Sequence, residues 1–164
     1  MTGSFTPRLL RDASVVPTDP QAVVEAFLAA LAGSDLETAG ALLDEHVRYV
    51  NVGLPTVRGR GRTLAVLRPL ARRGFTFEVY LHSIAVNGPT VLTERTDVLV
   101  LGPVRLQFWV TGRFDVRDGL ISLWRDSFDY LDCTRALLRG LLGAVAPALR
   151  PAAPVSADIA PGRH

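Results

Sequence analysis

Apolar residues recur at helical spacing near the start of the chain. Five of them fall on one face of such a helix: Val23, Val24, Phe27, Leu28 and Leu31. Asp19 followed by Pro20 is typical of a helix start, and Gly33 is typical of a helix end. Ser34 and Glu37 form a candidate capping box for a second short helix that runs through Leu43. The pattern therefore predicts a helical hairpin with one apolar side.

From residue 46 onward the helical period gives way to alternation. Residues 47–52 predict a short strand, and a glycine- and arginine-rich turn at 58–62 leads into a third helix. That helix carries its apolar residues on one face: Leu64, Leu67, Leu70 and Ala71. Four long strands follow, separated by turn signals at Asn87-Gly88, Gly102-Pro103 and Asp118-Gly119. A final helix is predicted over residues 132–146.

Helices followed by an antiparallel meander predict one α+β domain over residues 19–146. The helices are expected to pack on one side of the sheet. If the sheet is strongly curved, its concave face and the helices enclose a cone, and the interior of the cone is the natural small-molecule site. Residues 1–18 are predicted to form a flexible arm, and the Ala- and Pro-rich residues 147–164 a disordered tail.

Charge and cysteine content exclude several classes of protein. The 164 residues carry a formal charge of only +2, with 18 arginines and no lysine, too small a field to indicate nucleic acid as a partner. The single cysteine, Cys133, excludes an internal disulfide and a cysteine-rich metal site. The first 20 residues lack the apolar core of a signal peptide, and no apolar run is long enough to span a bilayer. We therefore expect a cytoplasmic protein with no membrane partner.

Polar residues interrupt the predicted strands at one repeated spacing. Three pairs stand two positions apart: Tyr49 and Asn51, Arg95 and Asp97, and Trp124 and Asp126. A strand repeats every second residue, so each pair projects onto one face. Turned inward, the three faces would bring two carboxylates, an arginine, a phenol and an amide into one apolar pocket. Such a pocket suits the handling of a proton and a water.

The inward register rests on Trp124 and Phe128, which bracket Asp126 with large apolar groups. Charges among such groups are costly unless they are paired. A structural alternative is a cross-strand ion-pair cluster of Arg95, Asp97 and Asp126, as many sheets carry. A phenol and an amide from a distant strand favour a functional site, because a surface network does not need them.

Other chemistry-bearing residues have simpler interpretations. The arginines between 58 and 73 lack interleaved aromatic residues, which favours a solvated helix face over a nucleic-acid patch. His46 and His82 have no partner at metal-ligand spacing, so no metal site is predicted. Cys133 is interpreted as a packed thiol. Four leucines of the last helix are expected to close the cone or to form a subunit contact: Leu137, Leu138, Leu141 and Leu142.

Three stretches together resemble the motifs of the limonene-1,2-epoxide hydrolase family: Tyr49-x-Asn51, Thr93-Glu94-Arg95-Thr96-Asp97 and Leu123-Trp124-Arg125-Asp126-Ser127-Phe128-Asp129. Each pair alone is a weak signal, but the combination is specific. The similarity covers roughly residues 19–146. It implies the cone-shaped fold that this family shares with nuclear transport factor 2 (NTF2), ketosteroid isomerase and SnoaL-like polyketide cyclases.

The resemblance also implies a role for each motif residue. Asp126 would be the general base, with Tyr49 and Asn51 helping to hold the nucleophilic water. Asp97 would be the general acid toward the epoxide oxygen, and Arg95 would bridge the two carboxyl groups. The family is typically homodimeric and uses no metal or organic cofactor, so we expect a homodimer that needs none.

Elementary chemistry independently suits these residues to epoxide opening. Two carboxyl groups that share one arginine in an apolar site favour keeping a proton on one of them. The protonated group donates to the epoxide oxygen while its ionised partner takes a proton from water. Which carboxyl keeps the proton is a property of the coupled pair, so its assignment to Asp97 rests on the resemblance.

The predicted substrate is a small apolar epoxide, which water converts to a vicinal diol in one step. Candidate walls of the pocket are apolar residues in the inward register: Leu99, Phe128, Trp124, Phe108 or Val110, and Phe77 or Val79. Two alternatives stay open. One is a cyclase or isomerase in which one Asp moves a proton next to a carbonyl, and the other is a non-catalytic binding or dimerisation module built on the same cone.

Overall fold

The computed structural model describes residues 18–72 and 74–145. Its helices are α1 (Pro20–Ala32), α2 (Leu36–Ala41), α3 (Arg60–Leu67), the 3-10 helix η1 (Arg68–Ala71) and α4 (Tyr130–Val145). Its strands are β1 (Leu43–Asn51), β2 (Val57–Arg58), β3 (Phe75–Asn87), β4 (Thr90–Leu101), β5 (Val104–Arg117) and β6 (Leu120–Ser127). The predicted arm and tail lie outside the described residues, apart from residue 18.

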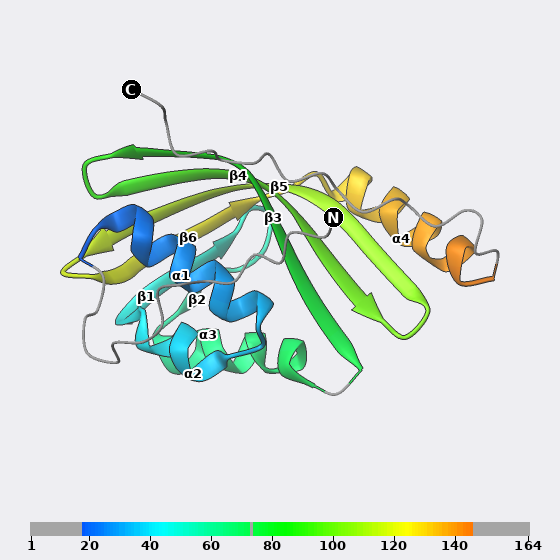
Figure 1. The fold of residues 1–164 in the computed structure, drawn as a ribbon, viewed down its shortest axis with the longest axis horizontal. Coiled ribbons are helices and arrows are strands. Elements are labelled where there is room, and N and C mark those ends of the chain that lie inside the picture. The colour runs from blue at the N-terminus through cyan, green and yellow to red at the C-terminus, as the bar shows by residue number, and fades with distance from the viewer. Residues whose placement is uncertain (1–17, 73, 146–164) are drawn as a thin grey trace, which may run out of the picture.

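The strands form one mixed sheet in the order β2-β1-β6-β5-β4-β3, with α1, α2 and α3 gathered on one side of it (Figure 1). The pair β1–β6 is parallel, and every other neighbouring pair is antiparallel. The register between β3 and β4 shifts between Leu81 and Ser83, and a bulge of this kind bends the strand that carries it. The arrangement confirms the predicted α+β class with a curved mixed sheet.

The first two helices show how local chemistry fixes their starts. The Asp19 carboxylate accepts a hydrogen bond of 2.9 Å from the Ala22 N–H, as predicted for a cap. The predicted cap of α2 is wrong by one residue. Asp35, not Ser34, accepts from the Thr38 N–H at 3.0 Å, while Ser34 takes a left-handed backbone with φ 57°. Leu43 belongs to β1 and not to this helix.

Three other predicted boundaries also differ from the structure. The strand predicted over 47–52 begins earlier, at Leu43, because it pairs with β6 from that point. The third helix begins at Arg60, inside the predicted turn, after Gly59 with φ 90°. The last helix begins at Tyr130, two residues earlier than predicted. The predicted turns at 87–88, 102–103 and 118–119 are confirmed as the links between β3, β4, β5 and β6.

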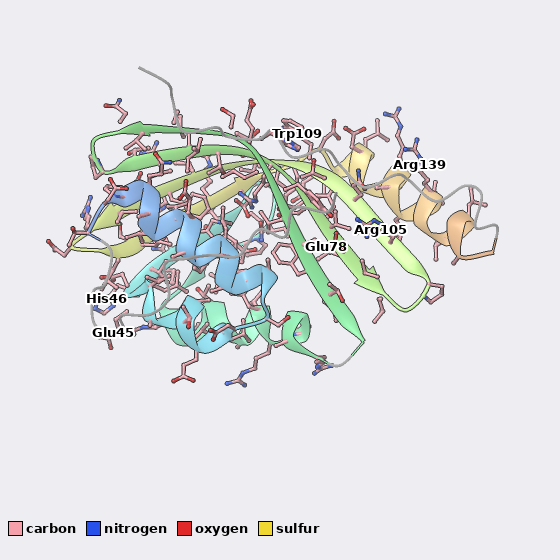
Figure 2. The ribbon with its side chains drawn as sticks, viewed as in Figure 1. Glu45, His46, Glu78, Arg105, Trp109 and Arg139 are labelled. Carbon is pink, nitrogen blue, oxygen red and sulfur yellow. The ribbon has the colours of Figure 1, made fainter. Side chains whose placement is uncertain are left out.

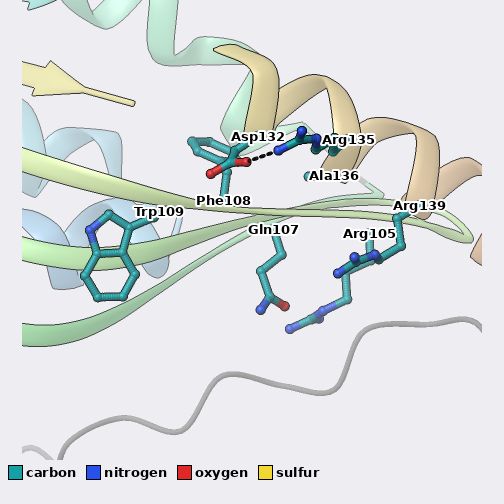
Figure 3. Close-up of a pocket in the computed structure, with 8 residues that line it drawn as sticks. All are labelled: Arg105, Gln107, Phe108, Trp109, Asp132, Arg135, Ala136 and Arg139. Carbon is teal, nitrogen blue, oxygen red and sulfur yellow. Dashed lines mark hydrogen bonds and ion pairs between the residues drawn. The ribbon is translucent and has the colours of Figure 1, made fainter. Parts of the chain in front are cut away.

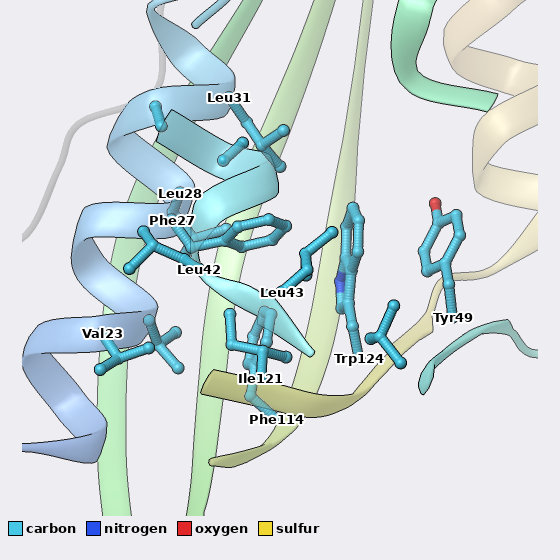
Figure 4. Packing of buried hydrophobic residues seen from close by; sticks show 14 of the residues in the cluster. Val23, Phe27, Leu28, Leu31, Leu42, Leu43, Tyr49, Phe114, Ile121 and Trp124 are labelled. Carbon is cyan, nitrogen blue, oxygen red and sulfur yellow. The ribbon is translucent and has the colours of Figure 1, made fainter. Parts of the chain in front are cut away.

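The core lies between α1 and the concave face of the sheet. Figure 4 shows Phe27 of α1 reaching toward Trp124 of β6, and their rings meet edge to face with centroids 5.0 Å apart. Phe114 of β5 contacts both rings, with its centroid 6.2 Å from that of Phe27 and 6.3 Å from that of Trp124. All three side chains are buried. These contacts hold α1 against β5 and β6.

Helix α4 lies along a part of β5 that β6 does not reach. The β5–β6 ladder runs only from Thr111 to Arg117, so the first half of β5 would otherwise be an open edge. Gly140 lets the helix approach that edge, since a Cβ there would lie 2.6 Å from the Arg105 carbonyl oxygen. No helix in the described ranges is long and apolar enough to cross a membrane.

Candidate active site

The three predicted pairs converge on the concave face. The parallel ladder between β1 and β6 sets Tyr49 opposite Trp124 and Asn51 opposite Asp126. Asn51 therefore stands beside Asp126, as expected for an amide that helps to hold a water there, while Tyr49 stands beside Trp124, two residues from Asp126. The Tyr49 and Trp124 rings stack with centroids 4.0 Å apart (Figure 4).

Arg95 of β4 joins the two carboxyl groups. Its Nε donates to Asp97 Oδ1 at 2.9 Å, and its Nη2 donates both to Asp97 Oδ2 at 3.3 Å and to Asp126 Oδ2 at 2.7 Å. Its remaining nitrogen, Nη1, donates to the Thr93 hydroxyl at 3.3 Å. Every nitrogen of this guanidinium therefore has an acceptor.

The cluster is buried, which makes its pairing necessary. Arg95 is 1% exposed, and Asp97 and Asp126 are each 5% exposed. A buried charge without a partner costs several kcal/mol, on the order of 3–5 when one member of a pair is removed. Asp126 Oδ1 is buried and has no hydrogen-bond partner among the described residues. One acceptor of the cluster is therefore left without a donor in the part of the chain that the structure describes.

Burial and charge give the titratable groups distinct proton affinities. Burial raises the pKa of Asp97 to about 6, and the Asp126 charge adds to this, while the charge and hydrogen bonds of Arg95 oppose it. Burial also raises the pKa of Tyr49 to about 12, although the Asn51 side chain partly opposes the shift. At neutral pH the phenol therefore keeps its proton, and Asp97 holds a proton far more readily than an exposed aspartate.

The predicted wall residues lie near the acid in different ways. Asp97 stands between Phe108 of β5 and Val79 of β3 in the sheet, and Arg95 stands opposite Val110. Leu99 lies two residues beyond Asp97 and pairs with Phe77 and Leu106. Phe128 meets Phe108 edge to face, with centroids 5.8 Å apart. These residues extend the apolar surface from the acid toward the start of α4.

Trp124 is placed differently from the other predicted walls. Its side chain is 3% exposed and packs between Tyr49 and Phe27, within the core. It supports the phenol from behind, and direct contact with a substrate stays a prediction. Its Nε1 is buried without a hydrogen-bond partner among the described residues.

Sequence reasoning missed three residues that shape the site. Thr93 accepts from Arg95, and Gly112 of β5 lies between Thr93 and Asp126 in the sheet. A glycine inside a strand pattern was the available signal for a close approach. Tyr130 donates to the Val52 carbonyl at 2.6 Å and so ties the start of α4 to the segment after Asn51. That contact joins residues 78 positions apart, and no local pattern indicates it.

The histidines and the cysteine, which were given no catalytic role from the sequence, lie outside the Arg95 cluster. His82 stacks on Trp109 with centroids 4.7 Å apart and shares a hydrogen bond of 2.8 Å with Thr96. Cys133 is half-buried in α4, and His46 lies exposed on β1. No group of three or more His, Cys, Asp or Glu side chains in the described part of the chain could hold a metal ion.

Two hollows open on the surface, toward opposite ends of the molecule (Figure 2). One, of about 340 Å³, lies between β5 and α4 and is lined by Arg105, Trp109 and Arg139 among others (Figure 3). The other lies beside Glu45 and the start of α3. Neither contains a member of the Arg95 cluster, although Phe108 borders the first.

Comparison with known families decides between the alternatives left open by the sequence. A family model described as the limonene-1,2-epoxide hydrolase catalytic domain matches residues 18–139. The chain belongs to the limonene-1,2-epoxide hydrolase family. This confirms the predicted family and the predicted class of enzyme, an epoxide hydrolase of the limonene-1,2-epoxide hydrolase type.

Individual relatives agree with the family. Epoxide hydrolase EphG of Mycobacterium tuberculosis is 50% identical over 127 residues, which cover 77% of this chain and 85% of that protein. A solved LEH-like epoxide hydrolase of M. tuberculosis is similar at 47% identity and a TM-score of 0.77, covering 82% of this chain and 95% of that one. A protein with a ketosteroid isomerase-like fold from Catenulispora acidiphila shares 18% identity at a TM-score of 0.62, covering 70% and 91%. That last similarity concerns the fold alone and confirms the predicted cone.

Proposed function

We propose that this limonene-1,2-epoxide hydrolase family member adds water to a small apolar epoxide in one step, with Asp97 as acid and Asp126 as base. The observation that carries the proposal is a single buried arginine that bridges both carboxyl groups. The arginine and the two carboxyl groups carry one positive and up to two negative charges. A proton on one carboxyl group removes the excess negative charge and is therefore favoured. A pair of carboxyl groups with different proton affinities is what concerted acid and base catalysis needs.

Asp97 suits the role of acid. Its pKa is raised to about 6, chiefly by burial, and it stands opposite Phe108 and beside Val79 on apolar surface. A carboxylic acid in such surroundings donates readily to an oxygen that develops negative charge. The epoxide oxygen is then expected to lie next to the Asp97 carboxyl.

Asp126 suits the role of base. Arg95 occupies its Oδ2, whereas its Oδ1 has no partner among the described residues. Asn51 stands opposite Asp126 in the ladder, and Tyr49 lies on the same face. These two side chains offer an amide and a phenol to hold a water against Oδ1, as a positioned nucleophile requires.

The bonds and protons of the step balance without a cofactor. Asp126 takes a proton from the water as its oxygen forms a bond to one ring carbon. The bond between that carbon and the epoxide oxygen breaks, and Asp97 gives its proton to the oxygen. The product is a vicinal diol, and one proton must then return from Asp126 to Asp97 to restore the starting state.

The substrate we propose is an apolar epoxide, held by the walls beyond Asp97. Leu99, Phe108, Val110 and Phe128 would line that space, and none of them offers a polar group for a charged substrate. We further propose a homodimer. Five leucines of α4 are 45–59% exposed in the single chain: Leu131, Leu137, Leu138, Leu141 and Leu142. The predicted cytoplasmic location stays a prediction.

The test is a panel of epoxides of graded size, with the diols detected by mass spectrometry. A single turnover in heavy-oxygen water is then expected to place one heavy oxygen in the diol and none in the protein. Heavy oxygen in Asp126 or Asp97 would indicate an ester intermediate and overturn the one-step mechanism. A panel that yields no diol, with enzyme shown to be folded, would overturn the proposed reaction.

A further inference from the structure

Arg95 and Asp126 lie on strands that are not neighbours. Arg95 is on β4 and Asp126 on β6, with β5 between them. Strands pair about 4.8 Å apart, so the Arg95 and Asp126 side chains together must span roughly 10 Å of sheet. It reaches Asp126 Oδ2 at 2.7 Å while it is only 1% exposed, so it crosses β5 under cover of the surrounding side chains.

The residue beneath this crossing is Gly112. The β4–β5 ladder sets it opposite Thr93, and the β5–β6 ladder sets it opposite Asp126. A Cβ added at Gly112 would collide with Arg95 Nη1 and would lie 2.5 Å from the Thr93 hydroxyl oxygen. The backbone there has no positive φ, so its conformation does not demand glycine. What demands glycine is the space taken by the Arg95 guanidinium and the Thr93 hydroxyl that accepts from it, with the Phe114 ring 3.0 Å from the same point.

We propose that Gly112 is a positioning residue, which with Thr93 holds the Arg95 guanidinium over β5 so that it bridges Asp97 and Asp126. The gap left by the missing side chain admits the guanidinium, and the Thr93 hydroxyl accepts from its Nη1 at 3.3 Å. A glycine in the middle of a central strand lowers the stability of the strand. The passage of the guanidinium over β5 explains why a glycine is nevertheless present there. The catalytic consequence rests on the proposed function, but the crossing itself does not.

The first test is Gly112→Ala, with Gly61→Ala as the matched control. Gly61 lies in α3, and an added Cβ there meets nothing within 4 Å. Folding is checked by circular dichroism. Gly112→Ala is expected to lower kcat/KM by about 10²-fold or more, because an ångström-scale displacement of a catalytic group commonly costs that much. Gly61→Ala is expected to leave kcat/KM unchanged.

A double-mutant cycle on thermal stability tests the crossing without any substrate. The Tm is measured for the native chain, Gly112→Ala, Arg95→Ala and the double variant at pH 5, below the pKa of about 6 for Asp97. Gly112→Ala is expected to lower Tm by several degrees in the native chain and by less when Arg95 is alanine, because the clash with the guanidinium is then gone while the contact with the Thr93 hydroxyl remains. An unfolded Gly112→Ala chain beside a folded double variant would support the proposal in the same way.

Equal losses of Tm in both backgrounds would overturn the proposal, because the clash would then involve Thr93 or Phe114 and not the guanidinium. The proposal would also be overturned if the double variant were unfolded while Arg95→Ala alone remained folded. A third measurement is the titration of the Asp97 carboxyl group, monitored by carbon-13 NMR. Arg95 lowers that pKa, so its displacement is expected to move the midpoint upward. An unchanged midpoint in folded Gly112→Ala would also count against the crossing, whatever reaction the enzyme catalyses.

Discussion

Two arginines of this chain stand two residues before an aspartate on a strand and differ in surroundings. The Arg95 and Asp97 side chains are 1% and 8% exposed, whereas those of Arg113 and Asp115 are 48% and 21% exposed. Both arginines use Nε and Nη2 to hold both carboxylate oxygens. An exposed pair of this kind contributes about 0–1 kcal/mol to stability, while a buried one controls proton affinity as well. Burial, and not the motif, therefore separates the candidate site from an ordinary surface ion pair.

This contrast supplies a matched control for Arg95→Lys. A lysine carries the charge but lacks the planar fork that reaches both aspartates at once. We expect Arg95→Lys to lower kcat/KM by about 10²-fold or more, in line with the loss of a preorganised charged donor. Arg113→Lys makes the same chemical change on the exposed pair and is expected to keep native activity. Native kcat/KM in Arg95→Lys would show that bridging of the two carboxyl groups is unnecessary.

Asp97 is expected to give the enzyme its alkaline limit. An acid is active only while it holds its proton, so kcat/KM should fall as pH rises through about 6, the pKa of Asp97 in the free enzyme. Asp97→Asn is expected to lose about 10²–10⁴-fold in rate and to lose this limb. The measurement is a profile of kcat/KM against pH for both proteins. A native profile that stays flat from pH 5 to pH 8 would contradict the assignment of Asp97 as acid.

At the scale of elements, Tyr130→Phe tests how α4 supports the site. The Tyr130 hydroxyl holds the Val52 carbonyl, and the Val52 N–H donates to the Asp126 carbonyl at 2.9 Å. Val52 follows Asn51, so the contact fixes the backbone that carries the amide. Loss of one exposed hydrogen bond costs about 1 kcal/mol or less in stability. We expect a several-fold loss of kcat/KM with little change in Tm.

The control for that variant is Tyr80→Phe. Tyr80→Phe also removes a hydroxyl that has a partner, Glu78 at 2.7 Å, but Tyr80 lies opposite Thr96 in the ladder and so on the other face of the sheet from Asp97. It is expected to keep native kcat/KM. Equal activity of both variants and the native enzyme would show that α4 does not need Tyr130 to hold the segment after Asn51.

The elements show where sequence patterns suffice and where they do not. Helix α1 and the turns at 87–88, 102–103 and 118–119 depend on local periodicity and turn chemistry, and they were predicted correctly. Strand β1 starts earlier than its own pattern indicates, because pairing with β6 begins at Leu43. The spacing of two selected the polar side chains of β1, β4 and β6 that the structure brings together. The crossing over Gly112 was not, since it depends on the register of three strands distant in sequence.

At the scale of the whole molecule, the leucines of α4 form an apolar face that the single chain leaves exposed. Small residues of the same helix, among them Ala136 and Gly140, take the side toward β5. We expect the native protein to be a dimer in which this face is covered, and Leu138→Ser with Leu142→Ser to make it monomeric. Light scattering after size exclusion measures the mass. Leu92→Ser, on β4 and 48% exposed, is the control that should stay dimeric.

Stability against pH is a second property of the whole molecule that the buried cluster should set. The folded chain keeps a proton on Asp97 up to about pH 6, while the unfolded chain releases it near 3.8. Between these values the folded state binds more protons, so the free energy of unfolding should fall as pH rises. The difference between 3.8 and about 6 corresponds to a change in the free energy of unfolding on the order of 3 kcal/mol. Urea unfolding at a series of pH values measures this free energy.

Asp97→Asn lacks this titration, so the difference between the stability curves of the native protein and the variant should change across pH 4–6 and be constant above pH 6. A constant difference across the whole range would mean that Asp97 does not hold its proton in the folded protein, and its role as acid would fail with it.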